Sequence, residues 1–204
     1  MCIRDRFYIA AMNREQGTAW GNNFYREADG LDPRVLSEIE IGGRMKIRGA
    51  LELLRKGMPG WEKCWLIDTV SQLGVRRSRR LTGTYQITGP QTATVDWRHP
   101  DAIGRGNDFR QEHLTYDIPY GSLVPEKLDG LLTCGRCLSC DHEALEPIRE
   151  IHVCWVSGEG AGAAAALAVR EGVQPREVKV AELQATLRGA NVAFGEDYGG
   201  EPHP

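Results

Sequence analysis

Three evenly spaced cysteines are the first residues of this sequence whose types suggest chemistry. Cys134, Cys137 and Cys140 form the pattern C-x-x-C-x-x-C. Thiolates at such spacing bind zinc or an iron–sulfur cluster, or form a redox-active dithiol. A metal site usually needs a fourth ligand, which here could only be His142 or Cys154, because the sequence has no second C-x-x-C. The other interpretation is that these cysteines are small buried residues.

Clustered glycines are the second chemical signal. The chain has 24 glycines in 204 residues, well above the roughly 7% that is typical of proteins. Gly158, Gly160 and Gly162 recur at every second position and precede a run of alanines. Small residues four apart share one face of a helix, so the helix can closely approach a flat ring or another backbone. Both interpretations stay open from the residues alone.

The helices expected to position these residues are marked by end signals. Asp32 and Pro33 predict a helix start, with Asp32 as N-cap, and the apolar pattern predicts an end near Lys56 and Gly57. A second helix is predicted from Ile151 to Arg170, closed by Gly172. A third is predicted over residues 178–187, followed by a frayed end from residue 191.

Apolar runs and alternating residues predict short strands between these helices. The expected fold class is therefore α/β, in the sense of mixed α and β structure. Residues 7–32 and 103–106 are expected to be irregular and residues 92–99 a short helix. Strands or extended segments are predicted at residues 64–70, 81–88, 114–123 and 128–133, with Pro119 marking an edge or a bulge.

The composition excludes several classes of protein. Lys and Arg number 25 against 28 Asp and Glu, for a net charge of −3, so we expect no nucleic-acid partner. No run approaches the roughly 18 apolar residues of a membrane span, and the amino terminus lacks the order of a secretory signal. A cytoplasmic location is expected, because a secreted disulfide scaffold would be shorter and richer in cysteine.

Four segments in order resemble the carboxyl-terminal signature of FAD-dependent oxidoreductases, in the two-dinucleotide-binding flavoprotein class. They are RRLTG at 79–83, YDIPYGSLVP at 116–125, LLTCGRCLS with the following HEAL over 131–145, and GEGAGAAAALA at 158–168. The resemblance extends over roughly residues 43–192. It implies an FAD cofactor, a small-molecule substrate, and transfer of a hydride or two electrons between them. It does not specify the electron acceptor.

The resemblance also implies roles for individual residues. The predicted strand at 128–133 would present Gly135, Arg136 and Cys137 to the cofactor, with backbone N–H groups and one cation near a phosphate. The amino end of the glycine-rich helix would point at the flavin ring. That helix would contribute Gly158, Gly160, Ala161 and Gly162. On the substrate side, His142 is the candidate for proton transfer; the alternative is a histidine that caps the backbone. Arg80 is the candidate for binding an anionic group; the alternative is a solvated basic residue at the end of a strand.

The sequence departs from this family at its amino terminus, where no G-x-G-x-x-G supplies an adenosine-diphosphate site. We therefore interpret the chain as a carboxyl-terminal part of an FAD-dependent oxidoreductase that does not bind FAD tightly or act alone. Residues 1–6 are interpreted as a non-native leader and 7–127 as a substrate-side region. Residues 128–192 are assigned to the FAD-binding domain and 193–204 to a flexible tail. The alternative function is a metal-binding or dithiol module built on Cys134, Cys137 and Cys140.

Overall fold

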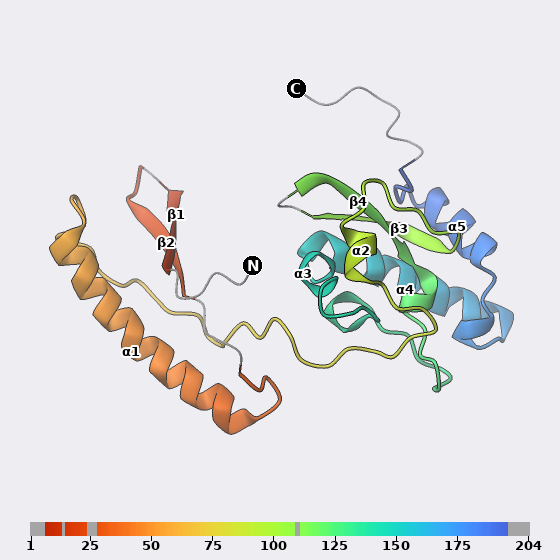
Figure 1. Ribbon diagram of the computed structural model, residues 1–204, viewed down its shortest axis with the longest axis horizontal. Helices are drawn as coiled ribbons and strands as arrows, with labels where there is room; N and C mark the ends of the chain where they lie inside the picture. The colour runs from red at the N-terminus through yellow and green to blue at the C-terminus, as the bar shows by residue number, and fades with distance from the viewer. Residues whose placement is uncertain (1–6, 14, 24–27, 109–110, 196–204) are drawn as a thin grey trace. The chain divides into compact units, whose positions relative to one another are not determined.

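The computed structural model describes residues 7–13, 15–23, 28–108 and 111–195. They form two compact units that divide between Ser78 and Arg79 (Figure 1). The predicted leader at 1–6 and most of the predicted tail lie outside the described residues. The functional division at residues 127 and 128 stays a prediction. Among the helices described, none has both the length and the apolar character needed to cross a membrane.

The first unit begins with a hairpin that the sequence analysis did not predict. Strands β1 (Phe7–Asn13) and β2 (Thr18–Asn23) pair antiparallel. Gly17 adopts φ +66° in the connection, a conformation that glycine adopts without steric cost. The prediction of irregular structure over residues 7–32 was therefore wrong for the two strands.

Helix α1 (Pro33–Gly57) confirms the predicted start and end. The Asp32 carboxylate accepts a hydrogen bond of 2.8 Å from the Arg34 N–H, which satisfies one of the unpaired donors of the first turn. The segment after α1 was predicted to form a strand at 64–70, but it forms none. Side chains of α1 hold it instead: the Arg55 guanidinium donates to the Cys64 carbonyl over 2.8 Å, and the Leu73 N–H donates to a Glu40 carboxylate oxygen over 2.8 Å.

The second unit is built on the antiparallel strands β3 (Ala102–Asp108) and β4 (Gln111–Pro119). Helix α4 (Ile151–Glu171) packs against β3, and α5 (Val180–Gly189) packs against both α4 and β3 (Figure 1). The predicted α4 is confirmed, including Gly172 after its last turn with φ +67°. Two short helices, α2 (Gly89–Thr92) and α3 (Leu145–Ile148), and three 3-10 turns complete the unit: η1 (Tyr120–Ser122), η2 (Gly135–Cys137) and η3 (Pro175–Glu177).

The core of this unit joins the hairpin to the helices. Fully buried side chains include Ile103 and Ile118 of the hairpin, Val153 of α4 and Leu183 of α5. Phe194 is also buried, because it packs against this core beyond α5. The predicted fraying from residue 191 is therefore wrong at Phe194, whereas the flexible tail at 193–204 stays a prediction.

Several predictions of local structure in this unit were wrong. Residues 103–106 belong to β3 rather than to a loop, and residues 128–133 form no strand. The short helix predicted at 92–99 occupies Gly89–Thr92 instead. The strand predicted at 81–88 is reduced to isolated bridges at Gly83 and Ile87. Residues 81–88 instead bond to a distant segment, because the Leu81 N–H donates to the Cys137 carbonyl and the Ile87 N–H to the Ser139 carbonyl.

Candidate functional site

The turn η2 holds the predicted cofactor residues next to α4. Gly135 adopts φ +67°, and its N–H donates a hydrogen bond of 2.9 Å to the hydroxyl of the buried Ser157. The same hydroxyl donates to the Val153 carbonyl one turn earlier in α4, over 2.8 Å. Gly135, Arg136 and Cys137 are therefore fixed beside the first half of α4 by an irregular segment and a turn, rather than by the end of a strand.

Three of the four family-like segments converge on this turn. The Leu81 N–H donates to the Cys137 carbonyl over 2.8 Å, so segment 79–83 lies against segment 131–145. The Ser139 N–H donates to the Ser122 carbonyl over 2.8 Å, which adds segment 116–125. Gly83 fits tightly between them, because a Cβ there would lie 2.8 Å from the Ser139 Cβ. Segments that are distant in the sequence therefore form one contiguous layer.

The two predicted catalytic residues lie at the edge of this layer. Arg80 is exposed, and its guanidinium donates to the Asp141 carbonyl over 2.5 Å. His142 follows Asp141 directly and is also exposed. The Asp141 carboxylate is used locally, because it accepts hydrogen bonds from the Gly89 N–H over 3.0 Å and the Ala144 N–H over 2.7 Å. The structure thus brings Arg80 next to the residue that precedes His142.

The glycines of α4 divide between opposite sides of the helix. Around Gly158 and Gly162, an added Cβ would meet nothing within 4 Å. At the buried Gly160, it would lie only 2.4 Å from the Ile103 Cδ1 of β3. Ala161 is half-buried and packs against the core. Close helix–strand packing therefore accounts for Gly160, while Gly158 and Gly162 leave an open surface.

The glycine-rich segment also lies inside the helix rather than at its start. Helix α4 begins at Ile151, seven positions before Gly158. The expectation that the amino end of this helix points at the flavin ring therefore concerns residues near Ile151 rather than the glycines, and it stays a prediction. The dipole of α4 is centred on its first turn near Ile151, so Gly158 and Gly162 offer access to the helix surface rather than a terminal charge.

The cysteines do not form a metal centre in the part of the chain that the structure describes, where no group of three or more potential ligands is placed to hold an ion. Cys134 and Cys137 are exposed, whereas Cys140 is buried. Burial raises the pKa of the Cys140 thiol, and the nearby Arg80 guanidinium partly opposes this. Burial also raises the pKa of Cys154.

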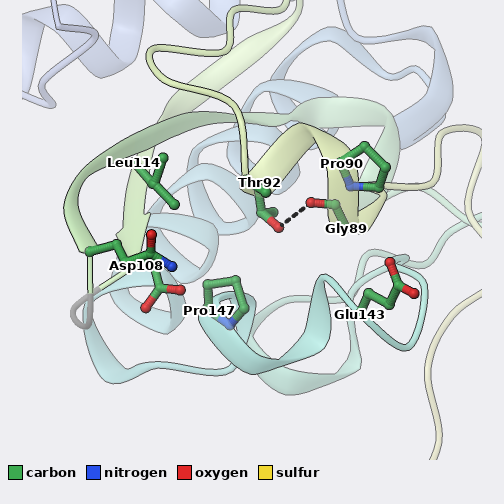
Figure 2. Close-up of a pocket in the computed structure, with 9 residues that line it drawn as sticks. Gly89, Pro90, Thr92, Asp108, Leu114, Glu143 and Pro147 are labelled. Carbon is green, nitrogen blue, oxygen red and sulfur yellow. Dashed lines mark hydrogen bonds between the residues drawn. The ribbon is translucent and has the colours of Figure 1, made fainter. Parts of the chain in front are cut away.

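A pocket of about 330 Å³ lies elsewhere in the same unit, between α2, the hairpin and α3. Figure 2 shows the carboxylates of Asp108 and Glu143 on either side of Pro147, below α2. The Thr92 hydroxyl donates to the Gly89 carbonyl over 3.0 Å and helps close α2. Sequence reasoning did not predict this pocket, because Asp108, Glu143 and Pro147 share no motif and meet only through tertiary packing.

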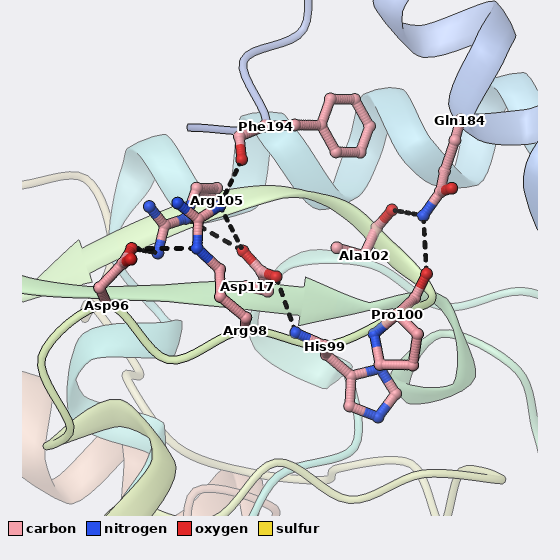
Figure 3. Close-up of polar contacts among 9 residues, drawn as sticks. All are labelled: Asp96, Arg98, His99, Pro100, Ala102, Arg105, Asp117, Gln184 and Phe194. Atoms are coloured by element: carbon pink, nitrogen blue, oxygen red, sulfur yellow. Dashed lines mark hydrogen bonds and ion pairs between the residues drawn. The ribbon is translucent and has the colours of Figure 1, made fainter. Parts of the chain in front are cut away.

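An ion cluster around the buried Asp117 supports the hairpin from another side. Asp117 of β4 is buried and accepts hydrogen bonds from the Arg105 guanidinium over 3.0 Å and from the His99 N–H over 2.8 Å (Figure 3). Asp96 pairs with Arg105 over 2.6 Å and with Arg98 over 3.1 Å. Burial raises the pKa of Asp117 against these partners. The cluster joins β3 to β4 and has the character of a structural network.

Comparison of the sequence with known protein families supports the resemblance that these segments carry. A family model described as FAD dependent oxidoreductase matches residues 4–187. The chain therefore belongs to the FAD dependent oxidoreductase family, which confirms the resemblance found in the sequence and extends it toward the amino terminus. Neither the search of curated proteins nor the search of solved structures found a match.

Proposed function

We propose that η2 and the open side of α4 form the part of an FAD site that faces the flavin ring. The residues assigned to it are Gly135, Arg136 and Cys137 from η2 and Gly158, Ala161 and Gly162 from α4. The observation that carries the proposal is the hydrogen bond from the Gly135 N–H to the Ser157 hydroxyl, 2.9 Å long. It holds the family-like turn against the residue that directly precedes Gly158 in α4.

The residues present fit a flat, anionic cofactor. Gly158 and Gly162 have free space above them, so a ring can lie against the helix backbone. Close to η2, the Thr133 hydroxyl is buried and has no hydrogen-bond partner among the described residues, and a bound cofactor would satisfy it. Arg136 is exposed at the same turn and suits a phosphate group. Gly160 contributes indirectly, by letting α4 pack on β3.

The proposed activity is a two-electron oxidation or reduction of a small organic substrate. FAD, when bound, supplies the acceptor or donor of a hydride. His142 then holds or releases the proton that accompanies the hydride, because an imidazole ring nitrogen can accept or donate a proton. Arg80 orients an anionic group of the substrate, because guanidinium has five donors and its contact with the Asp141 carbonyl uses one nitrogen. We also propose a cytoplasmic location, supported by the pattern of cysteines in the sequence.

Titration of the purified chain with FAD tests the cofactor site. We expect saturable binding with a Kd above about 1 μM, because the sequence contains no G-x-G-x-x-G to hold the diphosphate. Gly158→Leu and Gly162→Leu should each weaken binding by about tenfold or more, equivalent to about 1.4 kcal/mol. Gly189→Leu is the matched control, since Gly189 also lies in a helix with open space around it.

Unfolding curves for each variant establish that the fold is retained. Equal binding by all three variants would contradict the proposed surface, as would the lack of saturable binding to the unsubstituted chain. Submicromolar affinity would contradict the expectation that the diphosphate-binding contribution is missing. A flavin spectrum without stoichiometric zinc or iron would support the flavin site over a cysteine-bound metal, whereas stoichiometric metal lost in Cys137→Ser would overturn it.

A further inference from the structure

The turn η2 carries a cysteine at each end. Cys134 is its N-cap, with an extended backbone at φ −146° and ψ 172°, and Cys137 is its last residue. Both side chains are exposed. The turn is closed by a hydrogen bond from the Leu138 N–H to the Gly135 carbonyl. The two thiols are therefore presented to solvent by a short element with defined geometry.

This geometry suits a disulfide between the two ends. A 3-10 turn has three residues per turn and rises about 2 Å per residue, so the Cα atoms of Cys134 and Cys137, three positions apart, come within about 7 Å of each other. Disulfides join Cα atoms that are roughly 4.4–6.8 Å apart. In a capping box, the side chains at the N-cap and the third position each reach the backbone N–H of the other residue, so these two positions are close neighbours. Cys134 and Cys137 can thus be joined without a large backbone movement.

The surroundings favour reaction at these two thiols over the neighbouring ones. Cys154 lies behind the turn, where its Sγ would be 3.5 Å from a Cβ added to Gly135. Burial disfavours the thiolate of Cys154, and also that of Cys140, and the thiolate is the reactive species.

We propose that Cys134 and Cys137 form a redox-active pair that exchanges with small disulfides such as oxidised glutathione. One cysteine thiolate attacks a sulfur of oxidised glutathione, which forms a mixed disulfide and releases one glutathione thiolate. The second cysteine, after losing its proton, attacks the protein sulfur of the mixed disulfide and releases the second glutathione. In total, the protein loses two protons and two electrons, and one oxidised glutathione becomes two reduced glutathiones.

This inference goes beyond the proposed FAD site, because the exchange requires no flavin. Formation of the bond would restrain η2, whose Gly135 is hydrogen-bonded to Ser157 of α4. A change in the redox state of the pair would therefore change the conformational freedom of the turn assigned to the cofactor. The test below is performed without FAD, so its result is independent of whether the flavin site is correct.

The full chain is incubated in glutathione buffers of increasing oxidised fraction, quenched with an alkylating reagent and analysed by peptide mass mapping. The sequence contains six cysteines, and we expect the oxidised protein to retain four alkylatable thiols, with Cys134 and Cys137 joined. Cys134→Ser and Cys137→Ser should each abolish this intramolecular bond and leave a glutathione adduct on the remaining cysteine. Cys64→Ser and Cys154→Ser should still form it.

Two results would overturn the proposal. If the bond survives in Cys137→Ser but is lost in Cys154→Ser, the partner of Cys134 is Cys154. If all six cysteines stay alkylatable, or the mapped peptides carry only glutathione adducts, the pair does not close. Because the substituted residues are exposed, Cys134→Ser and Cys137→Ser should fold, and an unfolding curve for each variant verifies this.

Discussion

The packing of Gly160 on Ile103 makes a quantitative prediction for one added methyl group. In Gly160→Ala, the new Cβ would lie 2.4 Å from the Cδ1 and 3.1 Å from the Cβ of Ile103. The Cδ1 can move by rotation, but the Cβ is attached to the β3 backbone, and isoleucine is stiff at its first torsion. Overpacking of this kind costs about 1–3 kcal/mol.

Gly162→Ala is the matched control, because it makes the same change two residues later in α4, where nothing lies within 4 Å. Replacing glycine by alanine inside a helix favours folding by up to about 1 kcal/mol. This gain applies to both variants and cancels in their comparison. We therefore expect Gly160→Ala to be less stable than Gly162→Ala by about 1–3 kcal/mol.

Urea unfolding, followed by far-ultraviolet circular dichroism, measures both free energies. Ile103→Val removes the Cδ1 atom and should recover part of the loss when combined with Gly160→Ala, so the two effects are not additive. Equal stability of Gly160→Ala and Gly162→Ala would refute the assignment of opposite sides of α4 to these glycines. Full additivity of Ile103→Val and Gly160→Ala would refute the contact itself.

Three further predictions follow from single contacts. Ser157→Ala removes the acceptor of the Gly135 N–H and should lower the free energy of unfolding by about 1–2 kcal/mol, measured in urea; an unchanged midpoint would contradict that hydrogen bond. Gly172→Ala places a side chain at φ +67° and should lower the free energy of unfolding by about 1 kcal/mol in the same assay. A more stable variant would contradict this prediction. Burial raises the pKa of Asp117 in the folded chain. As pH rises above about 4, the unfolded chain therefore releases the Asp117 proton while the folded chain still holds it, and the contribution of this group to the free energy of unfolding falls. Asp117→Asn should therefore show a weaker decline with pH than the unsubstituted chain, and a steeper decline would show that the pKa is lowered instead.

The helix ends could be predicted from sequence because their signals are local. Asp32 caps α1 within two residues of its own position, and Gly172 closes α4 with the positive φ that glycine allows. Neither signal depends on a partner from a distant part of the chain. The mixed α and β class follows from such local patterns, and the structure confirms it.

Most of β4 lies in the extended segment predicted at 114–123, but β3 could not be predicted, because glycine occurs both in loops and in irregular strands. Gly104 has φ +147° and lies where the register of β3 and β4 shifts, as expected of an irregularity within a strand. Gly106 lies beneath the Tyr116 ring, since an added Cβ would be 2.8 Å from that ring. Both glycines belong to a strand, although their sequence pattern indicated a loop.

The candidate site was predictable in its motifs but not in its geometry. The motifs identified Gly135, Gly158, Gly160 and Gly162 without showing which side of α4 each residue occupies. Only the position of Ile103 on β3 distinguishes Gly160 from its neighbours. The same limit applies to the pocket at Asp108, whose lining residues come from separate segments without a shared motif.

Hydrogen–deuterium exchange with and without a saturating concentration of FAD tests the central claim most directly. If η2 and the open side of α4 bind the flavin, FAD should slow amide exchange at residues 133–138 and in the part of α4 around residues 154–162. The hairpin β3–β4 serves as an internal reference and should change little. Protection confined to other segments, or no protection at a concentration that saturates the binding signal, would contradict this assignment.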